Sequence, residues 1–289
     1  MNRKTIFDFQ TMKTKGEKVV FITSYDYPTA QFAEAAGVDM ILVGDSLGMC
    51  VYGYEGTIPV VMDQMIFHAE AVRRGAPSTF LVGDMPFMSY QSSTEKAVEN
   101  AGRFLKEAHC DAIKLEGGKR IVPTIRAIVD AGIVVMGHIG LTPQSSGQLG
   151  GHKAQGRTIE SARTVIEDAL AVQQAGAQML LLEAVPPEVG GLITQLLRIP
   201  VYGIGGGGET NGQLLIVSDV IGQFQAFTPK FVKRYANVAE VITSAMKDYC
   251  ADVKAGKFPG PEHAYTMIKS EAPNFPTLAD EYRRKLGRN

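Results

Sequence analysis

Short apolar runs bounded by turn signals recur along the chain and predict its strands. The clearest is the run MILV at residues 40–43, which stops at Gly44, Asp45 and Ser46. Four or five apolar residues between turn signals are typical of a strand that is buried on both faces, as in a parallel sheet covered by helices. The other predicted strands are residues 19–24, 80–84, 112–116, 133–137, 200–204 and 214–219, and one that ends at Glu183.

Helical segments are predicted between these strands. They include residues 5–12, 28–37, 92–108, 159–175 and 237–254. The alternation favours an α/β fold of the (β/α)8 TIM barrel class with a short amino-terminal helix, and an open doubly wound sheet is the alternative. We expect one catalytic barrel domain over residues 1–265, closed by the helix at 237–254, and a carboxyl-terminal extension over residues 266–289.

Composition and charge narrow the class of protein. Of the 289 residues, 45% are hydrophobic and 20% are charged, which is typical of a soluble domain with a full core. The net charge of −1 and the lack of a basic stripe argue against a nucleic-acid partner. No apolar run approaches the ~20 residues of a membrane span, so we expect no membrane partner. With no secretory signal and with Cys50, Cys110 and Cys250 far apart, we expect free thiols and a cytoplasmic location.

Polar residues end most of the predicted strands, and in a barrel these ends meet at one mouth. They are the acids Asp26, Asp45, Asp84, Glu116 and Glu183, with Lys114 and His138 among them. Because side chains alternate along a strand, Lys114 and Glu116 share one face, which is predicted to look into the barrel lumen.

A set of carboxylates this close together needs protons or a cation. Two carboxylates ~5 Å apart repel by about 3 kcal/mol at an effective dielectric of ~20. Oxygen ligands without paired cysteines or histidines favour Mg²⁺ over Zn²⁺. The alternative is that several of these acids cap helices or pair with arginines, that His138 anchors a loop, and that Lys114 is a surface residue.

Several longer motifs resemble the ketopantoate hydroxymethyltransferase family. They are YDY at 25–27, VGDSLGM at 43–49, DMPFM at 84–88, KLEGG at 114–118, GHIGLTPQS at 137–145, LLEAVP at 181–186, GIGGG at 203–207, PKF at 229–231 and FPGPEH at 258–263. The resemblance runs from about residue 3 to residue 265. It implies a (β/α)8 barrel, a homo-oligomer that is a decamer in bacterial members, and cytoplasmic work on the route to pantothenate and coenzyme A.

The resemblance also implies a reaction and roles for single residues. A one-carbon unit moves from 5,10-methylenetetrahydrofolate to 3-methyl-2-oxobutanoate through a Mg²⁺-stabilised enolate and gives 2-dehydropantoate. The metal ligands of the family match Asp45, Asp84 and Glu116, the last through water. The groups that bind the keto acid match Asp45, Ser46, Asp84 and Lys114, and we expect His138 to contact substrate or folate. Glu183 matches the proton acceptor, a role typically worth ~10²–10⁴-fold in rate.

The chain departs from the family pattern in the glycine-rich loop 205–212. The usual glycine-alanine-glycine is Gly205-Gly206-Gly207 here, and Asn211 replaces an aspartate. Because added glycine raises the entropic cost of ordering a loop, folate affinity is the property that we expect to differ. Residues 203–208 also match a dinucleotide fingerprint, but no acidic residue follows about 20 positions later.

Two other functions fit parts of the pattern. A barrel of the phosphoenolpyruvate-mutase or isocitrate-lyase type also uses strand-end acids and Mg²⁺ on keto acids. Those enzymes share a Lys-Cys-Gly-His type loop, and none of the three cysteines here has such neighbours. A non-catalytic barrel kept for assembly is the other alternative, and it predicts loss of the charged residues, all of which are present.

Overall fold

The computed structural model describes residues 3–287, which form two compact units. The first is Met1–Asn237 and contains the sheet, and the second is Val238–Asn289 and contains helices and loops. The units therefore separate after Asn237, whereas the sequence predicts a domain boundary at residue 265. A catalytic domain that extends to residue 265 stays a prediction.

Eight parallel strands close into a barrel in the order β1 to β8, which confirms the predicted (β/α)8 class. The strands are β1 (Val19–Thr23), β2 (Met40–Val43), β3 (Phe80–Asp84), β4 (Ala112–Glu116), β5 (Val135–Gly140), β6 (Met179–Glu183), β7 (Val201–Ile204) and β8 (Gly212–Leu215). The predicted bounds of β3 and β4 are confirmed. The predicted last strand, 214–219, is wrong in its second half, because residues from Val217 onward form a short helix.

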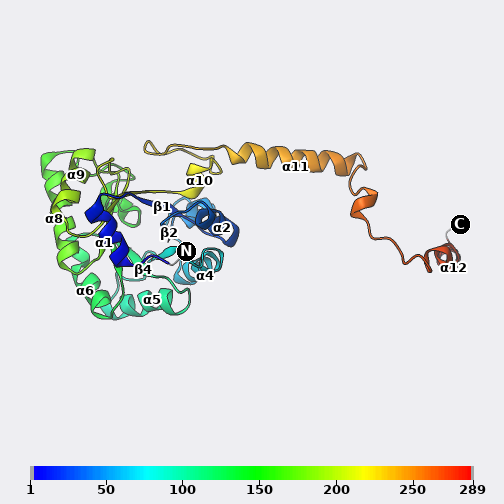
Figure 1. The fold of residues 1–289 in the computed structure, drawn as a ribbon, viewed down its shortest axis with the longest axis horizontal. Helices are drawn as coiled ribbons and strands as arrows, with labels where there is room; N and C mark the ends of the chain where they lie inside the picture. The colour runs from blue at the N-terminus through cyan, green and yellow to red at the C-terminus, as the bar shows by residue number, and fades with distance from the viewer. Residues whose placement is uncertain (1–2, 288–289) are drawn as a thin grey trace. The chain divides into compact units, whose positions relative to one another are not determined.

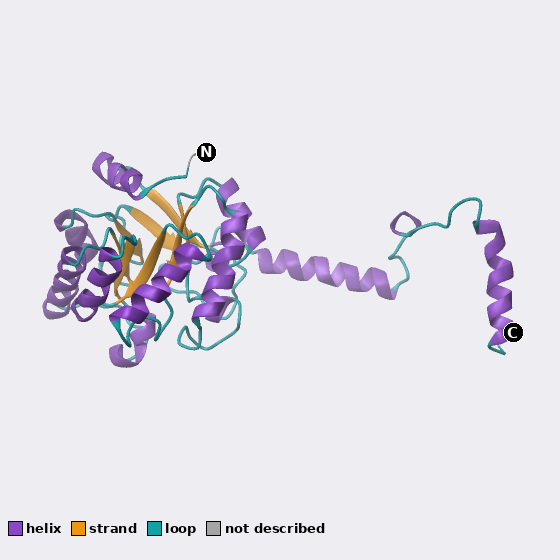
Figure 2. Ribbon diagram, turned by 90° about the horizontal axis from the view of Figure 1, so that it is seen from below, coloured by secondary structure: helices purple, strands orange, loops and turns teal. Residues whose placement is uncertain are grey.

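Helices surround the strands of the first unit (Figures 1 and 2). They are α2 (Tyr27–Ala35), α3 (Leu47–Cys50), α4 (Met62–Gly75), α5 (Thr94–Lys106), α6 (Val122–Asp130), α7 (Ser146–Leu149), α8 (Ile159–Gln174), α9 (Pro187–Leu196) and α10 (Val217–Val220), with the 3-10 turns η1 (Lys119–Ile121) and η2 (Pro143–Ser145). Between β7 and β8 the glycine-rich residues 205–211 make the crossover without a helix.

Asn211 ends this crossover at the amino-terminal end of the barrel. Its carbonyl oxygen accepts a hydrogen bond of 2.9 Å from the N–H of Val19, the first residue of β1. Its Oδ1 accepts from the N–H of Val201, the first residue of β7, at 2.9 Å, and from Nζ of Lys13 at 3.2 Å. Asn211 is thus at the opposite end from the strand-end acids, and its position gives no support to the expected effect on folate affinity.

Alternation along the strands divides the apolar core into two layers. Outward-facing residues such as Ile113 and Leu115 pack in the layer between the strands and the helices. The inward-facing residues form a second cluster, which we call the lower lumen: Val19, Phe21, Met40, Leu42, Phe80, Val82, Ala112, Met136, Met179, Leu181, Tyr202, Ile204 and Leu214, with Phe9 from α1 (Ile6–Lys15). The ring of Phe9 is fully buried, with its centroid 5.0 Å from that of Phe80. This packing closes the amino-terminal end of the barrel.

The second unit contains α11 (Val238–Lys254), η3 (Pro261–His263), η4 (Ala272–Asn274) and α12 (Phe275–Lys285). The predicted helix at 237–254 is therefore present as α11, and its role in closing the barrel stays a prediction. Neither α11 nor α12 buries a side chain. Among residues 3–287, no helix has the length and apolar character that a membrane crossing requires.

Candidate active site

On four neighbouring strands, the inward positions beyond the lower lumen are polar. Asp84 ends β3, Lys114 and Glu116 lie on β4, His138 lies on β5, and Glu183 ends β6. The first four residues are buried, with exposures of 1–2%. The sequence-based expectation that these strand-end residues meet at one mouth is confirmed.

Lys114 is the centre of this group. Its Nζ lies 2.8 Å from Oδ1 of Asp84, 3.6 Å from Oε1 of Glu116 and 3.2 Å from Nδ1 of His138. A buried ammonium is tolerated only when it is paired with opposite charge, and here two carboxylates supply that charge. Lys114 is therefore an interior residue, and the alternative of a surface lysine is wrong.

His138 links the carboxylates of neighbouring strands. Its Nδ1 lies 3.4 Å from Oε1 of Glu116, and its Nε2 lies 3.2 Å from Oε2 of Glu183, a contact without the alignment of a hydrogen bond. Burial and the charge of Lys114 favour the neutral ring, but the two carboxylates outweigh them and raise the pKa of His138 to about 9. The surrounding carboxylates thus favour the protonated form of His138.

Glu183 is the most accessible acid of the group, with 15% of its side chain exposed. Residue 140 of β5 runs very close to it: a Cβ atom on Gly140 would lie 2.3 Å from the carbonyl oxygen of Glu183, and Gly140 has a φ of 90°. Only glycine fits this approach and this backbone conformation. Glu183 thus sits at the rim of the mouth, beside the buried charges.

Asp45 and Ser46 join the group from the turn after β2. The backbone N–H of Asp45 donates to Oδ2 of Asp84 at 3.0 Å. Oγ of Ser46 lies 2.8 Å from the hydroxyl of Tyr25, which follows β1. Contacts therefore link the predicted charged residues around the mouth, and Ser46 adjoins them as the chain neighbour of Asp45, although the role of each stays a prediction.

Two buried residues that the sequence analysis did not single out complete the set. Gln144, in η2, donates from its backbone N–H to Oε2 of Glu116 at 3.0 Å and from Nε2 to Oδ2 of Asp45 at 2.9 Å. The hydroxyl of Tyr90 lies 2.8 Å from Oε1 of Gln144. The sequence signal for Gln144 is its place in the motif GHIGLTPQS at 137–145, and we find none for Tyr90.

The acids differ in how readily they ionise. Burial raises the pKa of Asp45 well above its ordinary value, and the charges of Asp84 and Glu116 raise it further. Burial also raises the pKa of Asp84, although Lys114 opposes the rise. For Glu116 the effect of burial is outweighed by Lys114 and His138, which lower its pKa. Asp45 is therefore the acid whose charge is least compensated by the surrounding protein.

The donor chemistry of the three buried acids suits a hard divalent cation, since it consists of carboxylate oxygens with excess negative charge. In the part of the chain that the structure describes, however, no group of three or more His, Cys, Asp or Glu side chains is already arranged to hold a metal ion. Lys114 instead occupies the space between Asp84 and Glu116. The residues fit such an ion in chemistry, and their contacts with Lys114 must change to accept it.

Two other acids near strand ends behave differently. The expectation that Asp26 joins the group is wrong, because Asp26 is exposed and its Oδ1 accepts a hydrogen bond of 2.7 Å from the N–H of Thr29 in the first turn of α2. The alternative function of a helix cap is correct at this position. Asp219, in α10 after β8, is only 5% exposed, and its side chain has no hydrogen bond or ion pair among residues 3–287.

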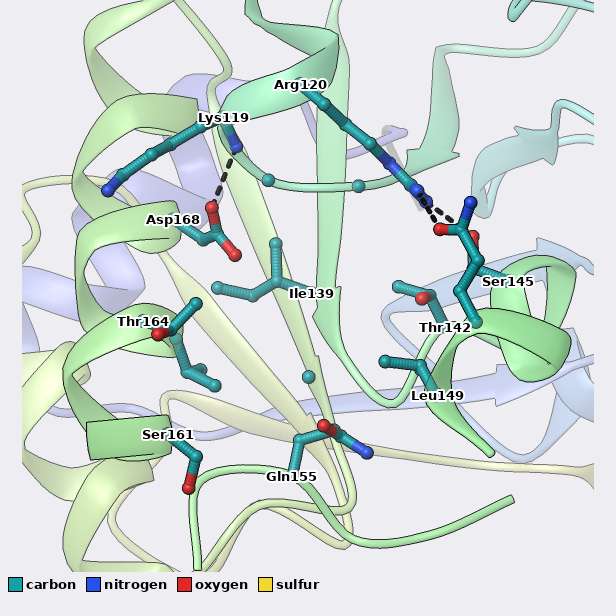
Figure 3. Close-up of a pocket in the computed structure, with 15 residues that line it drawn as sticks. Lys119, Arg120, Ile139, Thr142, Ser145, Leu149, Gln155, Ser161, Thr164 and Asp168 are labelled. Atoms are coloured by element: carbon teal, nitrogen blue, oxygen red, sulfur yellow. Dashed lines mark hydrogen bonds between the residues drawn. The ribbon is translucent and has the colours of Figure 1, made fainter. Parts of the chain in front are cut away.

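A cavity of about 440 Å³ lies beside the mouth, at the ends of β4 and β5 (Figure 3). Arg120 borders it on one side, and Lys119 and Asp168 of α8 lie next to each other on another. The guanidinium of Arg120 donates to Oε1 of Gln148 at 2.6 Å and to Oγ of Ser145, and the N–H of Lys119 donates to Asp168. The lining includes none of the predicted site residues, so this cavity is separate from the charged group.

The sequence is similar to proteins of known families over nearly its whole length. The family described as ketopantoate hydroxymethyltransferase matches residues 3–261. A relative from Alkaliphilus metalliredigens, named 3-methyl-2-oxobutanoate hydroxymethyltransferase, is 61% identical over 281 residues, which cover 97% of this chain and 99% of the relative. A relative of the same name from Geobacillus kaustophilus is 52% identical and covers 94% of this chain and 96% of its own.

Solved structures of lower identity share the barrel. A phosphonopyruvate hydrolase in complex with oxalate and Mg²⁺ superposes with a TM-score of 0.60 at 13% identity, covering 98% of both chains. A 2,3-dimethylmalate lyase of the PEP mutase/isocitrate lyase superfamily gives 0.57 at 17% identity, again over 98% of both chains. At such identities the likeness shows the fold alone.

Proposed function

The chain belongs to the ketopantoate hydroxymethyltransferase family, and from this membership we propose that it transfers a hydroxymethyl group from 5,10-methylenetetrahydrofolate to 3-methyl-2-oxobutanoate, giving 2-dehydropantoate for pantothenate and coenzyme A synthesis. The observation that carries the proposal is the buried set of contacts from Asp84 through Lys114 and His138 to Glu183. A carbon acid beside a carbonyl needs a base for its proton and positive charge for the enolate oxygen. This mouth offers both.

We assign the keto acid to Ser46 and Lys114, with Asp45, Asp84 and His138 around it. The Lys114 ammonium supplies positive charge for the substrate carboxylate or for the developing enolate. Ser46 supplies a hydroxyl that Tyr25 orients from 2.8 Å. The Ser46 hydroxyl is held in place before substrate arrives, so it needs little reorganisation during the reaction.

A divalent cation, expected to be Mg²⁺, is assigned to Asp45, Asp84 and Glu116, which offer the carboxylate oxygens that such an ion prefers. When bound, it polarises the keto oxygen and so acidifies the neighbouring C–H. The contact of Lys114 with Asp84 at 2.8 Å must lengthen or be shared when a second cation enters. We therefore propose that the Lys114 ammonium and the divalent cation compete for the carboxylate of Asp84.

Glu183 is assigned as the base that removes the C3 proton, because it is the accessible carboxylate of the group. Nε2 of His138 lies 3.2 Å from Oε2 of Glu183 and helps to hold this carboxylate in place. Water breaks the C–N bonds of the methylene carbon, so that tetrahydrofolate leaves and a carbon at the oxidation level of formaldehyde remains. The C3 enolate then forms a C–C bond to this carbon, and its oxygen takes a proton to become the hydroxyl.

One assay tests the reaction. The protein is incubated with 3-methyl-2-oxobutanoate, 5,10-methylenetetrahydrofolate and Mg²⁺, and 2-dehydropantoate is followed by mass spectrometry. Formation of the product that depends on all three additions supports the proposal, and absence of product with active reagents contradicts it. Exchange of the C3 hydrogen with D₂O, measured by NMR without folate, isolates the proton-removal step.

The resemblance to the family also leads us to propose a cytoplasmic homo-oligomer, with a decamer as the expected state. Light scattering of the purified chain measures the assembly directly. A stable monomer at micromolar concentration would contradict this part of the proposal without affecting the proposed chemistry of the mouth.

A further inference from the structure

Gln144 contacts two of the three acids assigned to the cation, although it carries no charge. Its backbone N–H donates to Glu116 at 3.0 Å, and its Nε2 donates to Asp45 at 2.9 Å. We propose that Gln144, held by Tyr90, is a positioning residue that sets the distance between Asp45 and Glu116 and so prepares the mouth for a divalent cation. This inference rests on the proposed function, since that function supplies the cation.

The orientation of the Gln144 amide is fixed by its neighbours. Nε2 faces two acceptors, Oδ2 of Asp45 and the carbonyl oxygen of Met85, each at 2.9 Å. Oε1 faces two donors, the Tyr90 hydroxyl at 2.8 Å and Nε2 of Gln91 at 3.2 Å. A flipped amide would set oxygen against oxygen on one side and donor against donor on the other. Asp45 therefore always meets an N–H group.

Tyr90 ties this amide to the neighbouring strand. Its hydroxyl oxygen accepts the backbone N–H of Glu116 at 3.0 Å. Its single proton has two acceptors, Oε1 of Gln144 at 2.8 Å and the carbonyl oxygen of Glu116 at 3.0 Å, and the shorter contact is with Gln144. The Tyr90 ring is 1% exposed and Gln144 is 4% exposed, so water does not compete for these bonds. Through this pair, the end of β4 and the turn after β2 are held in one rigid arrangement.

The three acids share a pattern that this arrangement explains. Each has one carboxylate oxygen bound by a neutral N–H: Asp45 by the Gln144 amide, Glu116 by the Gln144 backbone, and Asp84 by the backbone of Asp45. The other oxygens of Asp84 and Glu116 face Lys114, where positive charge is held. One side of each acid is thus anchored, and the free side of Asp84 and Glu116 is presented to a cation.

Partners that orient metal ligands typically contribute 10–100-fold to metal affinity. We therefore expect Gln144→Met, which keeps the size and the backbone N–H but removes the amide, to weaken Mn²⁺ binding by about 10–100-fold. Gln148→Met is the matched control, because Gln148 lies in the same loop and contacts Arg120 rather than an acid.

Binding of Mn²⁺ alone is measured by titration calorimetry and by electron paramagnetic resonance of the free ion, with and without 3-methyl-2-oxobutanoate. In the full assay, saturating Mg²⁺ should restore most of the rate of Gln144→Met, which a general loss of folding would not allow. Tyr90→Phe removes one oxygen atom and should weaken Mn²⁺ several-fold, so it tests the inference even if Gln144→Met does not fold.

Unchanged Mn²⁺ affinity in Gln144→Met or in Tyr90→Phe would overturn the positioning role. A parent protein that turns over keto acid while binding no divalent cation would instead overturn the proposed metal, and the inference with it. Normal Mn²⁺ binding by the parent together with weaker binding by the variants supports both. The two failures are therefore distinguishable from one set of samples.

Discussion

The lower lumen and the charged mouth are built on the same strands and differ only in how far along each strand a residue lies. On β4, Ala112 faces the lower lumen, whereas Lys114 and Glu116, two and four residues later on the same face, belong to the mouth. On β6 the same change runs from Met179 to Glu183. Alternation decides which residues face inward, and the distance from the strand end decides whether they pack or carry charge.

Burial has opposite effects on the stability of the two layers. Each large apolar side chain of the lower lumen stabilises the fold by ~1.5–3 kcal/mol through burial. Each charge of the mouth loses hydration on burial, and only its partners offset that loss. Changes in the lower lumen should therefore alter stability, whereas changes in the mouth should alter chemistry and pH dependence.

The largest effect expected from the mouth is on rate. Glu183→Gln removes the proposed base but keeps its size, so exchange of the C3 hydrogen of 3-methyl-2-oxobutanoate should fall ~10²–10⁴-fold. Substrate affinity and melting temperature should change little, because Glu183 is the least buried member of the group. NMR in D₂O measures the exchange. Glu188→Gln, an exposed acid on α9, is the control, and equal exchange rates in the two variants would remove Glu183 from the role.

The corresponding change in the lower lumen should act on stability alone. Phe9→Ala deletes a fully buried ring that meets Phe80, and we expect a loss of ~3–5 kcal/mol in the free energy of unfolding. The exchange rate per folded molecule should stay that of the parent. Phe7→Ala on the same helix is the control, since Phe7 is 72% exposed. Urea unfolding measures the stability of both variants. A loss of exchange activity in folded Phe9→Ala would contradict the view that the lower lumen affects stability alone.

A smaller effect expected from the mouth is a dependence of the free energy of unfolding on pH. The pKa of His138 is raised from 6.5 to about 9, so the folded state binds its proton more tightly than the unfolded state. Its stabilising contribution, at most ~3 kcal/mol, is complete below pH 6.5 and is lost as the pH rises through 9. Unfolding of the parent and of His138→Gln between pH 6 and 9.5, with chelator present, should converge at high pH. A constant difference would show that His138 stays uncharged.

The sequence predicted the geometry of the mouth correctly where that geometry depends on the residues of a single strand. The shared face of Lys114 and Glu116 follows from alternation within five residues. Asp26 was wrongly included because an acid after a strand can equally cap the next helix, and the chain turns into α2 there. Gln144 was missed although it lies in the motif GHIGLTPQS, because its role depends on contact with Asp45, which is 99 residues away in the sequence.

The smallest expected effect is a change in stability at Asp219. This buried acid has no side-chain hydrogen bond or ion pair, in the described residues, with either the lower lumen or the mouth. Burial raises its pKa above the ordinary value, so its charged form lowers stability at every pH above its unfolded pKa. Asp219→Asn should therefore stabilise the protein by about 1 kcal/mol at pH 7, and the gain should vanish as the pH falls below ~4. Asp26→Asn is the control: asparagine caps helices as well as aspartate, so unfolding should be unchanged. A loss of stability in Asp219→Asn would show that this carboxylate has a stabilising partner after all.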